Sequence, residues 1–334
     1  MYFEGKKILV IGGTGTIGKS VIKHLIKENP QVINIFSRDE YKQHKLQDEF
    51  GNSDKLSFII GDIREYDTLL NAMKDIDYVL HLAAMKRVDS CENNPYEAVK
   101  TNVHGTHNVM QAAISQNVKK VIFTSSDKAI SPTNSYGATK LIAERLISAA
   151  EWNRKENETI FASVRFGNVM GSRGSVIPLF KESILKNKKV SITDKNMTRF
   201  MMTLNQATEL TIKALKEAKG GEVFVLKMPV INLGDLADIL IEETCKKHQI
   251  IREEIDIEVT GLRPGEKMYE ELMTYDESIL AWELPDMFII PGSSSGEDRY
   301  RHAKKAKTGT YSSSSQETIN TNELRLLLKE AALI

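Results

Sequence analysis

Cysteine is scarce in this chain of 334 residues, which contains only Cys91 and Cys245. Two cysteines cannot build the disulfide framework of a small secreted protein, so a reducing compartment is expected. The sequence also lacks the run of about 18 apolar residues that would cross a membrane. The apolar segment KILVIGG follows Met1 too closely to leave room for a cleavable signal peptide. We therefore expect a cytoplasmic protein that has no membrane partner.

A net charge is also missing, since 45 Lys and Arg residues balance 45 Asp and Glu residues. Without a global positive field, nucleic acid is not an expected partner, and an anionic ligand must be held by local clusters. His104 and His107 are three residues apart, but no carboxylate or cysteine partners accompany them, so no metal site is expected.

Short apolar runs alternate with longer amphipathic segments, which is typical of an α/β fold with a Rossmann-like, doubly wound parallel sheet. Runs such as KILVIG and YVLHLA are continuously hydrophobic, as strands buried on both faces should be. The predicted strands are Lys7–Gly12, Val32–Ser37, Leu56–Gly61, Tyr78–Ala83, Lys120–Ser125 and Ile160–Arg165. The predicted helices include Ile17–Glu28, Pro95–Gln116 and Ser135–Trp152.

The regular alternation ends near Gly167, which divides the chain into three parts. Residues 1–167 are predicted to form a dinucleotide-binding domain. Residues 168–290 are predicted to form a smaller C-terminal substrate-binding region interleaved with the sheet. Residues 291–334 begin with a Ser-rich, basic segment, expected as a surface loop or extended tail, and return as a helix over Thr321–Ala332.

A glycine motif lies between the first predicted strand and the first predicted helix. Gly12, Gly15 and Gly18 have GxxGxxG spacing, which allows a tight turn, a close approach to a pyrophosphate and close packing of helix on strand. The N-terminus of the helix then offers free N–H groups to the phosphates. We expect this loop to hold a dinucleotide through Gly12, Thr14, Gly15, Thr16, Ile17 and Gly18.

The end of the second predicted strand favours NADP over NAD. Ser37 and Arg38, with Lys42 one turn later, suit a ribose 2′-phosphate, whereas a carboxylate would suit the free 2′-OH. Asp39 is the opposing signal, although it could equally cap the next helix. Further cofactor contacts are expected from Asp62, Ile63, Ala83 and Ala84, and Asp62 could instead cap a turn.

Tyr136 and Lys140 follow a Ser-rich strand end at i, i+4 spacing, so one helix face presents both side chains. A cationic Lys140 is expected to lower the pKa of the Tyr136 phenol, which could then take a proton from a sugar hydroxyl. Lys140 is also expected to contact the cofactor.

Taken together, these motifs resemble those of the extended short-chain dehydrogenase/reductases, and within them the UDP-N-acetylglucosamine 4,6-dehydratases. The resemblance covers nearly the whole chain. It includes AAMKRVDSCENNPYEAVKTNVHGT, SSDKAISPTNSYGATK, RFGNVMGSRGSVIPLF, MTRFMMT and GLRPGEKMYEEL. It implies a cytoplasmic, homo-oligomeric lyase that feeds deoxy-aminosugar or nonulosonic-acid biosynthesis, for a polysaccharide or a flagellin glycan.

The resemblance also implies roles for Asp127 and Lys128. The acid would protonate the departing hydroxyl at carbon 6, and a neutral Lys128 would remove the proton at carbon 5. An Asp–Lys pair is similar to that of the enzymes that invert carbon 5, whereas retaining enzymes have Asp–Glu. Ser126 is expected to hydrogen-bond the substrate near carbon 4.

The substrate, UDP-N-acetylglucosamine, is expected to contact residues that resemble the family's nucleotide-sugar grip. These are Lys86, Asn168, Ser175, Val176, Arg199, Arg263 and Glu266. Guanidinium groups suit a diphosphate, although Arg–carboxylate pairs can also be structural. Glu270 and Glu271, just beyond this motif, are expected on an exposed helix face.

Three other functions remain open. A UDP-hexose 4-epimerase or 4-reductase would share the cofactor loop and the Tyr–Lys pair, but it needs no acid at carbon 6. A variant enzyme could release a 5,6-unsaturated UDP-sugar. A non-catalytic NADP sensor could keep the glycine loop, but it would not need Tyr136 and Lys140.

Overall fold

The computed structural model describes residues 1–51, 53–153, 158–292, 300 and 302–334. Within these residues a ten-stranded sheet has the order β16-β14-β15-β10-β6-β5-β4-β1-β2-β3. Neighbouring strands from β3 to β10 are parallel, and β15, β14 and β16 continue the sheet antiparallel. The strands are β1 (Lys7–Ile11), β2 (Val32–Ser37), β3 (Leu56–Ile60), β4 (Tyr78–His81), β5 (Lys120–Thr124), β6 (Ile160–Arg165), β10 (Val223–Leu226), β14 (Trp282–Glu283), β15 (Met287–Ile290) and β16 (Lys304–Lys305).

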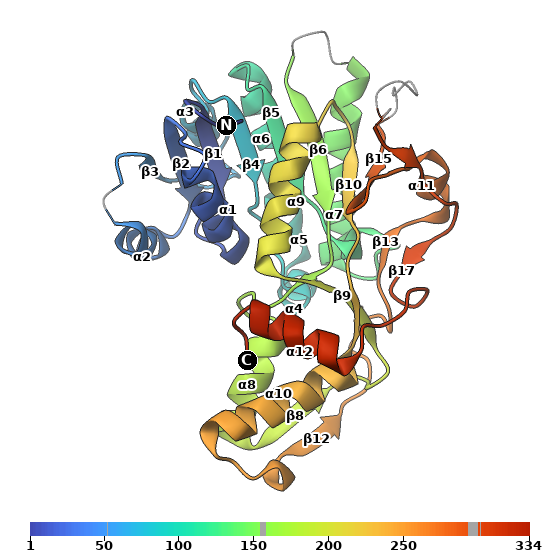
Figure 1. Cartoon of the computed structure of the whole chain (residues 1–334). Coiled ribbons are helices and arrows are strands. Elements are labelled where there is room, and N and C mark those ends of the chain that lie inside the picture. Colours follow the sequence, from blue (N-terminus) through green and yellow to red (C-terminus); the bar gives the residue numbers. More distant parts are fainter. Residues whose placement is uncertain (52, 154–157, 293–299, 301) are drawn as a thin grey trace.

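Helices cover both faces of this sheet, so the predicted doubly wound fold is confirmed (Figure 1). In β1, Ile8 and Val10 pack into one hydrophobic core, and Leu9 and Ile11 pack into the core on the opposite face. Because both faces are buried, these strands carry no polar alternation. Helices α1 (Thr16–Ile26), α2 (Glu40–Phe50) and α9 (Leu204–Glu217) contribute to the first core; α3 (Tyr66–Ala72), α6 (Gly105–Ser115) and α7 (Ser135–Ala149) contribute to the second.

One predicted helix is divided. In place of a single helix over Pro95–Gln116, the structure has α5 (Pro95–Val99), a π-helical turn η1 (Lys100–His104) and α6. Asn102 in this turn is buried, where its side chain accepts from Met85 N at 2.8 Å and donates to the Thr139 hydroxyl at 3.0 Å. These are tertiary contacts, so the helical periodicity of the sequence did not reveal the interruption. A preceding short helix, α4 (Val88–Asn93), packs against α7.

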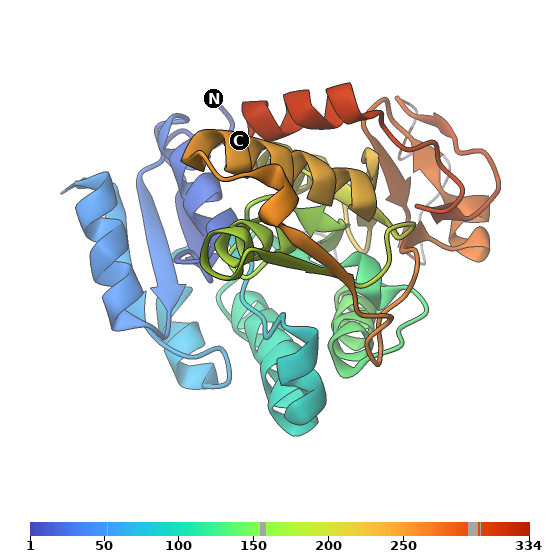
Figure 2. The ribbon, with the colours of Figure 1, turned by 90° about the horizontal axis from the view of Figure 1, so that it is seen from below.

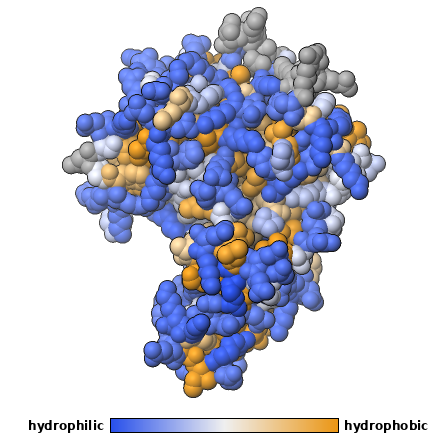
Figure 3. All heavy atoms as spheres, in the orientation of Figure 1, coloured by the Kyte–Doolittle hydropathy of each residue, from blue (hydrophilic) through white to orange (hydrophobic). Residues whose placement is uncertain are grey.

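The second half of the chain contributes to two places. It supplies α9, β10 and β15 to the main body, and it builds a smaller lobe that lies below the body in Figure 1. This lobe contains α8 (Val176–Asn187), β8 (Lys189–Ile192), α10 (Leu233–His248), β12 (Asp256–Val259) and α12 (Thr321–Glu330), with the short η4 (Arg252–Glu254) before β12. Figure 2 shows α12 beside α10, and Figure 3 shows apolar residues where the lobe joins the body. A three-stranded sheet of β7 (Asn168–Val169), β9 (Thr198–Met202) and β11 (Val230–Asn232) adds to this half.

In the Ser-rich segment after residue 291, two of the described stretches form short strands. β17 (Tyr311–Ser312) pairs with β13 (Glu271–Met273), and β16 pairs with β14 at the sheet edge. Ser313 is fully buried, and α11 (Tyr275–Leu280) follows β13. Residues 293–299 and 301 of the same segment lie outside the described residues. Among the described helices, none is long and apolar enough to cross a membrane.

Candidate active site

A cavity of about 480 Å³ opens where β1, β2, β4, β5 and β6 end. This is the edge at which doubly wound sheets bind ligands. Residues from both halves of the chain line the cavity. Among those predicted from the sequence are Gly12, Thr14, Gly15, Thr16, Ile17, Gly18, Ser37, Arg38, Lys42, Ile63, Ala83, Ala84, Lys86, Ser126, Asp127, Lys128, Tyr136, Lys140, Asn168 and Ser175.

The glycine loop has the geometry that the spacing predicts. Gly12 has φ +82°, and a Cβ there would lie 2.8 Å from Ala83 N. A Cβ on Gly18 would lie 2.6 Å from Gly12 O, so α1 can pack this closely only without a side chain. Gly15 precedes α1 with no side-chain cap, and the first N–H groups of the helix therefore remain available to an anion.

At the end of β2, Asp39, the carboxylate that opposed NADP, lines the cavity beside Arg38 and Lys42. Asp39 caps α2, accepting from Lys42 N at 3.0 Å, and it also pairs with the Lys42 ammonium. Arg38 is exposed, and Nη1 lies 3.6 Å from Asp62 Oδ2. Asp62 is held by Arg64, with Nε to Oδ2 at 2.9 Å, and it is not part of the cavity lining.

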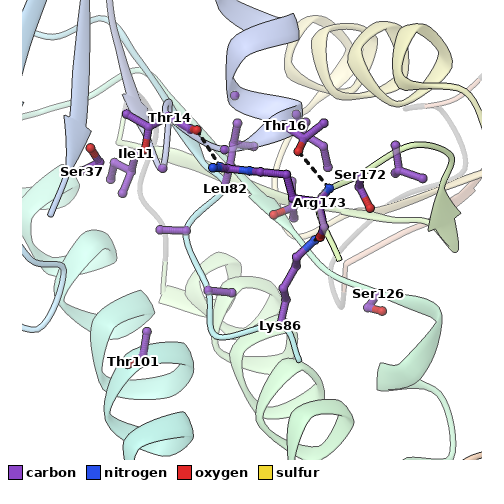
Figure 4. A pocket seen from close by; sticks show the side chains of 18 of the residues that line it. Ile11, Thr14, Thr16, Ser37, Leu82, Lys86, Thr101, Ser126, Ser172 and Arg173 are labelled. Carbon is purple, nitrogen blue, oxygen red and sulfur yellow. Dashed lines mark hydrogen bonds between the residues drawn. The ribbon is translucent and has the colours of Figure 1, made fainter. Parts of the chain in front are cut away.

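Arg173, which was not predicted, crosses the mouth of the cavity (Figure 4). Its guanidinium donates to Thr14 O at 2.9 Å, and its carbonyl accepts from Lys86 Nζ at 3.2 Å. The residue thus joins the second half of the chain to the glycine loop. Of the SRGS motif only Ser175 was predicted as a site residue, because nothing local indicates the reach of this arginine.

Helix α7 presents Tyr136 and Lys140 to the cavity. It begins after Asn134, whose side chain accepts from Gly137 N at 2.8 Å. A Cβ on Gly137 would lie 2.1 Å from Lys128 O, so this helix start sits directly on the turn η2 (Asp127–Ala129). The local sequence therefore brings the two predicted catalytic pairs together.

The ionisation of the Tyr–Lys pair differs from the expectation. Burial lowers the pKa of Lys140 to about 7, although the Glu144 carboxylate opposes this change. The Lys140 Nζ donates to Thr124 O at 2.8 Å. Burial also raises the pKa of the Tyr136 phenol, against the effects of hydrogen bonding to Ser126 and of the Lys128 charge. The expected lowering of this phenol's pKa by Lys140 is therefore wrong for the protein alone.

Lys128 is held between two carboxylates. Its Nζ lies 3.2 Å from Asp127 Oδ1 and 3.5 Å from Glu270 Oε1. Burial lowers the pKa of Lys128, but Asp127 and Glu270 outweigh burial and raise that pKa above its ordinary value. The expectation of a neutral Lys128 is wrong for this arrangement, because both neighbours favour the ammonium.

Glu270 was wrongly placed by the sequence. It lies just before β13, not on a helix, and it is only 4 % exposed. Glu271, the first residue of β13, is half-buried. Adjacent residues of an extended chain point in opposite directions, which was the only local signal that one of the two glutamates turns inward.

The predicted substrate contacts divide into two groups. Lys86, Asn168 and Ser175 line the cavity, and Asn168 Oδ1 and Ser175 Oγ are buried without a partner among the described residues. The others lie away from the lining: Val176, Arg199, Arg263 and Glu266.

Two of these four residues, Arg199 and Glu266, have structural contacts. The Arg199 guanidinium donates to the carbonyls of Thr198 and Lys267, both at 2.7 Å. Glu266 accepts from the Thr193 hydroxyl at 3.3 Å. In the described part of the chain, no group of three or more His, Cys, Asp or Glu could hold a metal ion.

The model of a protein family described as "Polysaccharide biosynthesis protein" matches residues 8–292. The chain belongs to this family. The resemblance to short-chain dehydrogenase/reductases and inverting UDP-N-acetylglucosamine 4,6-dehydratases is thereby confirmed at the level of the family.

Proteins similar to this chain carry different names. An "uncharacterized membrane protein" of Methanocaldococcus jannaschii is 44% identical, covering 100% of this chain and 98% of the relative. An inverting UDP-N-acetylglucosamine 4,6-dehydratase of Campylobacter jejuni is 41% identical over 87% of this chain and 84% of its own. A UDP-glucose 4-epimerase of Rickettsia prowazekii is 39% identical, covering 98% and 96%.

Solved structures agree on the fold. Pen from Bacillus thuringiensis has a TM-score of 0.95 and 58% identity, covering 100% of both chains. The dTDP-glucose 4,6-dehydratase DesIV of Streptomyces venezuelae, solved with NAD and TYD, has a TM-score of 0.70 and 19% identity, covering 78% of this chain and 86% of its own. This family member is therefore related to enzymes of the dehydratase/epimerase type, with which it shares its fold.

Proposed function

We propose that this chain is an NADP-dependent UDP-N-acetylglucosamine 4,6-dehydratase that inverts carbon 5. The observation that carries the proposal is the Asp127–Lys128 pair in the same cavity as Tyr136. An epimerase acts at carbon 4 alone and has no use for an acid and a base beside carbons 5 and 6. The name of the Campylobacter relative supports the same choice, and the Rickettsia relative's name keeps epimerisation as the alternative.

The cofactor site is expected to use the loop of Gly12 and Gly15, with the start of α1 facing the pyrophosphate. Ser37, Arg38 and Lys42 would receive the 2′-phosphate. When bound, the nicotinamide would supply the hydride-transfer chemistry that this reaction needs at carbons 4 and 6.

The side chains then divide the proton transfers. Tyr136 accepts the proton of the carbon 4 hydroxyl, which Ser126 orients. The resulting ketone makes the proton at carbon 5 acidic, and Lys128 removes it. Asp127 assists departure of the carbon 6 hydroxyl. Return of a proton to the opposite face of carbon 5 produces the inversion.

The test is incubation of the purified protein with UDP-N-acetylglucosamine in deuterium oxide, with NMR of the fresh product. We expect the 4-keto-6-deoxy sugar of L-arabino configuration, with solvent deuterium at carbon 5. Tyr136→Phe should slow turnover ~10²-fold or more, because the proton acceptor is lost.

Three products would contradict the proposal. A carbon 4 epimer without deuterium at carbon 5 would indicate an epimerase. A released 5,6-unsaturated UDP-sugar would indicate the truncated reaction, and a D-xylo product would indicate retention.

A further inference from the structure

Glu270 lies beside the candidate active site, and the proposed function does not yet give this carboxylate a role. Its backbone is held on both sides by Ser313, since Glu270 N donates to Ser313 Oγ at 3.0 Å and Ser313 N donates to Glu270 O at 2.8 Å. Two residues later, Leu272 O accepts from the buried Arg165 at 2.9 Å. The side chain is therefore fixed behind Lys128 by the fold of the second half of the chain.

The two carboxylates that flank Lys128 have different surroundings. Asp127 Oδ1 accepts from the Ser126 hydroxyl at 2.7 Å and from Lys128 N at 2.9 Å. Glu270 Oε2 is buried and has no hydrogen-bond partner among the described residues. Burial and the nearby Asp127 raise the pKa of Glu270, against the effect of the Lys128 charge.

The two carboxylates therefore differ in how their oxygens are satisfied. Asp127 has two hydrogen-bond donors besides the Lys128 ammonium, whereas Glu270 keeps a buried oxygen that has no donor among the described residues and could carry a proton. Glu270 does not line the cavity, so it can act on a substrate only through Lys128.

On the basis of the proposed function, we propose that Glu270 is a positioning residue that accepts a proton from Lys128, so that Lys128 meets carbon 5 as a neutral amine. The N–H bond of the ammonium breaks and an O–H bond forms on Glu270, leaving –NH₂ beside –COOH. The amine then takes the carbon 5 proton, and its lone pair forms the new N–H bond while the C–H electrons move into the enolate. The net charge of the Lys128–Glu270 pair is unchanged by the first transfer.

This relay resolves the conflict between the chemistry required of Lys128 and its raised pKa. The titratable and charged groups that face the pair are Asp127 from η2, Tyr136 from α7, Arg199 from β9 and Lys267 from the loop before β13. None of them is both buried and short of hydrogen-bond donors in the manner of Glu270. With the relay intact, formation of the amine does not require release of a proton to solvent.

The test is Glu270→Gln in the full-length protein with its cofactor, compared with Glu271→Gln as the matched control on the adjacent residue. Two steps are followed with UDP-N-acetylglucosamine: nicotinamide reduction by absorbance, and deuterium entry at carbon 5 by NMR. We expect Glu270→Gln to reduce nicotinamide within about threefold of the normal rate, but to slow deuterium entry ~10²-fold at pH 7. Its remaining exchange rate should rise about tenfold per pH unit from pH 7 to 9, because Lys128 must now lose its proton to water.

Glu270→Asp should recover part of the exchange rate and a flatter pH profile, since a carboxylate returns. Exchange at the normal rate in Glu270→Gln would overturn the relay, as would equal loss of both steps or a similar loss in Glu271→Gln. If the unmodified protein reduces its nicotinamide but places no deuterium at carbon 5, the proposed function itself fails, and the relay fails with it.

Discussion

At the scale of single residues, the burial of Lys140, which the proposed function places beside Tyr136, lowers the stability of the fold. Its ammonium is buried, donates to Thr124 O at 2.8 Å and lies 4.5 Å from the centre of the Phe123 ring. Burial nevertheless lowers the pKa of Lys140 from 10.5 to about 7. The unfolded chain binds this proton more tightly than the folded protein does. The free energy of unfolding is therefore highest above pH 10.5, decreases as the pH falls, and levels off below about pH 7.

Lys140→Met removes this titration and should abolish oxidation of the substrate. We expect the variant to gain stability relative to the normal protein as the pH is lowered. Between pH 9 and pH 6 the difference in the free energy of unfolding should grow by ~2–3 kcal/mol. Urea unfolding at the two pH values measures this change, and a difference that is the same at both would contradict the burial argument.

At the scale of elements, Arg165 joins the two walls of the active site. Arg165 is the last residue of β6 and is fully buried. Its Nε donates to Glu144 Oε2 of α7 at 3.1 Å, and its Nη1 donates to Glu277 Oε2 of α11 at 2.9 Å. Because α7 carries Tyr136 and the chain before α11 carries Glu270, this one arginine sets both relative to the sheet.

Removing a partner of a buried charge leaves that charge poorly compensated. Glu277→Gln keeps the side-chain volume and the cap of α11, yet we expect it to lower the free energy of unfolding by ~3 kcal/mol. Chemical denaturation is the measurement. Glu182→Gln, which alters an exposed pair with Lys186 on α8, is the control and should leave the midpoint unchanged. Equal effects of the two substitutions would show that the Arg165 cluster is not a structural joint.

At the scale of the whole molecule, the proposed function requires a chain with no net charge to hold the diphosphates of its cofactor and its substrate by local cations. Arg38, Lys42, Lys86 and Arg173 all line the candidate active-site cavity. In the proposed reaction the substrate gives a hydride to the cofactor and receives it back within one turnover. The cofactor is therefore regenerated in the site and does not need to dissociate.

Mass spectrometry of the denatured protein should therefore detect NADP(H). Arg38→Ala should shift binding toward NAD by about tenfold, the value of one charge-assisted hydrogen bond. Arg87→Ala is the control, since Arg87 is exposed and pairs with Asp89. Release of NAD alone from the unmodified protein would contradict the choice of NADP.

Much of the active site follows from the sequence because it depends on neighbours in the chain. Gly12 and Gly18 shape the turn between β1 and α1, and Asn134 starts α7 so that Tyr136 and Lys140 share a face. The parallel strands were readable because burial on both faces leaves continuous apolar runs. Each of these features lies within a few residues of its cause.

Only the tertiary structure decided which distant residues meet. Arg173 reaches Thr14, Arg165 joins Glu144 to Glu277, and Glu270 turns toward Lys128. A single sequence records no direction for such side chains, because packing between elements chooses their neighbours. The charge state of Lys128 was also decided by the tertiary structure. Asp127 and Glu270 raise the pKa of Lys128 against the effect of burial, and only the fold brings Glu270 to this position.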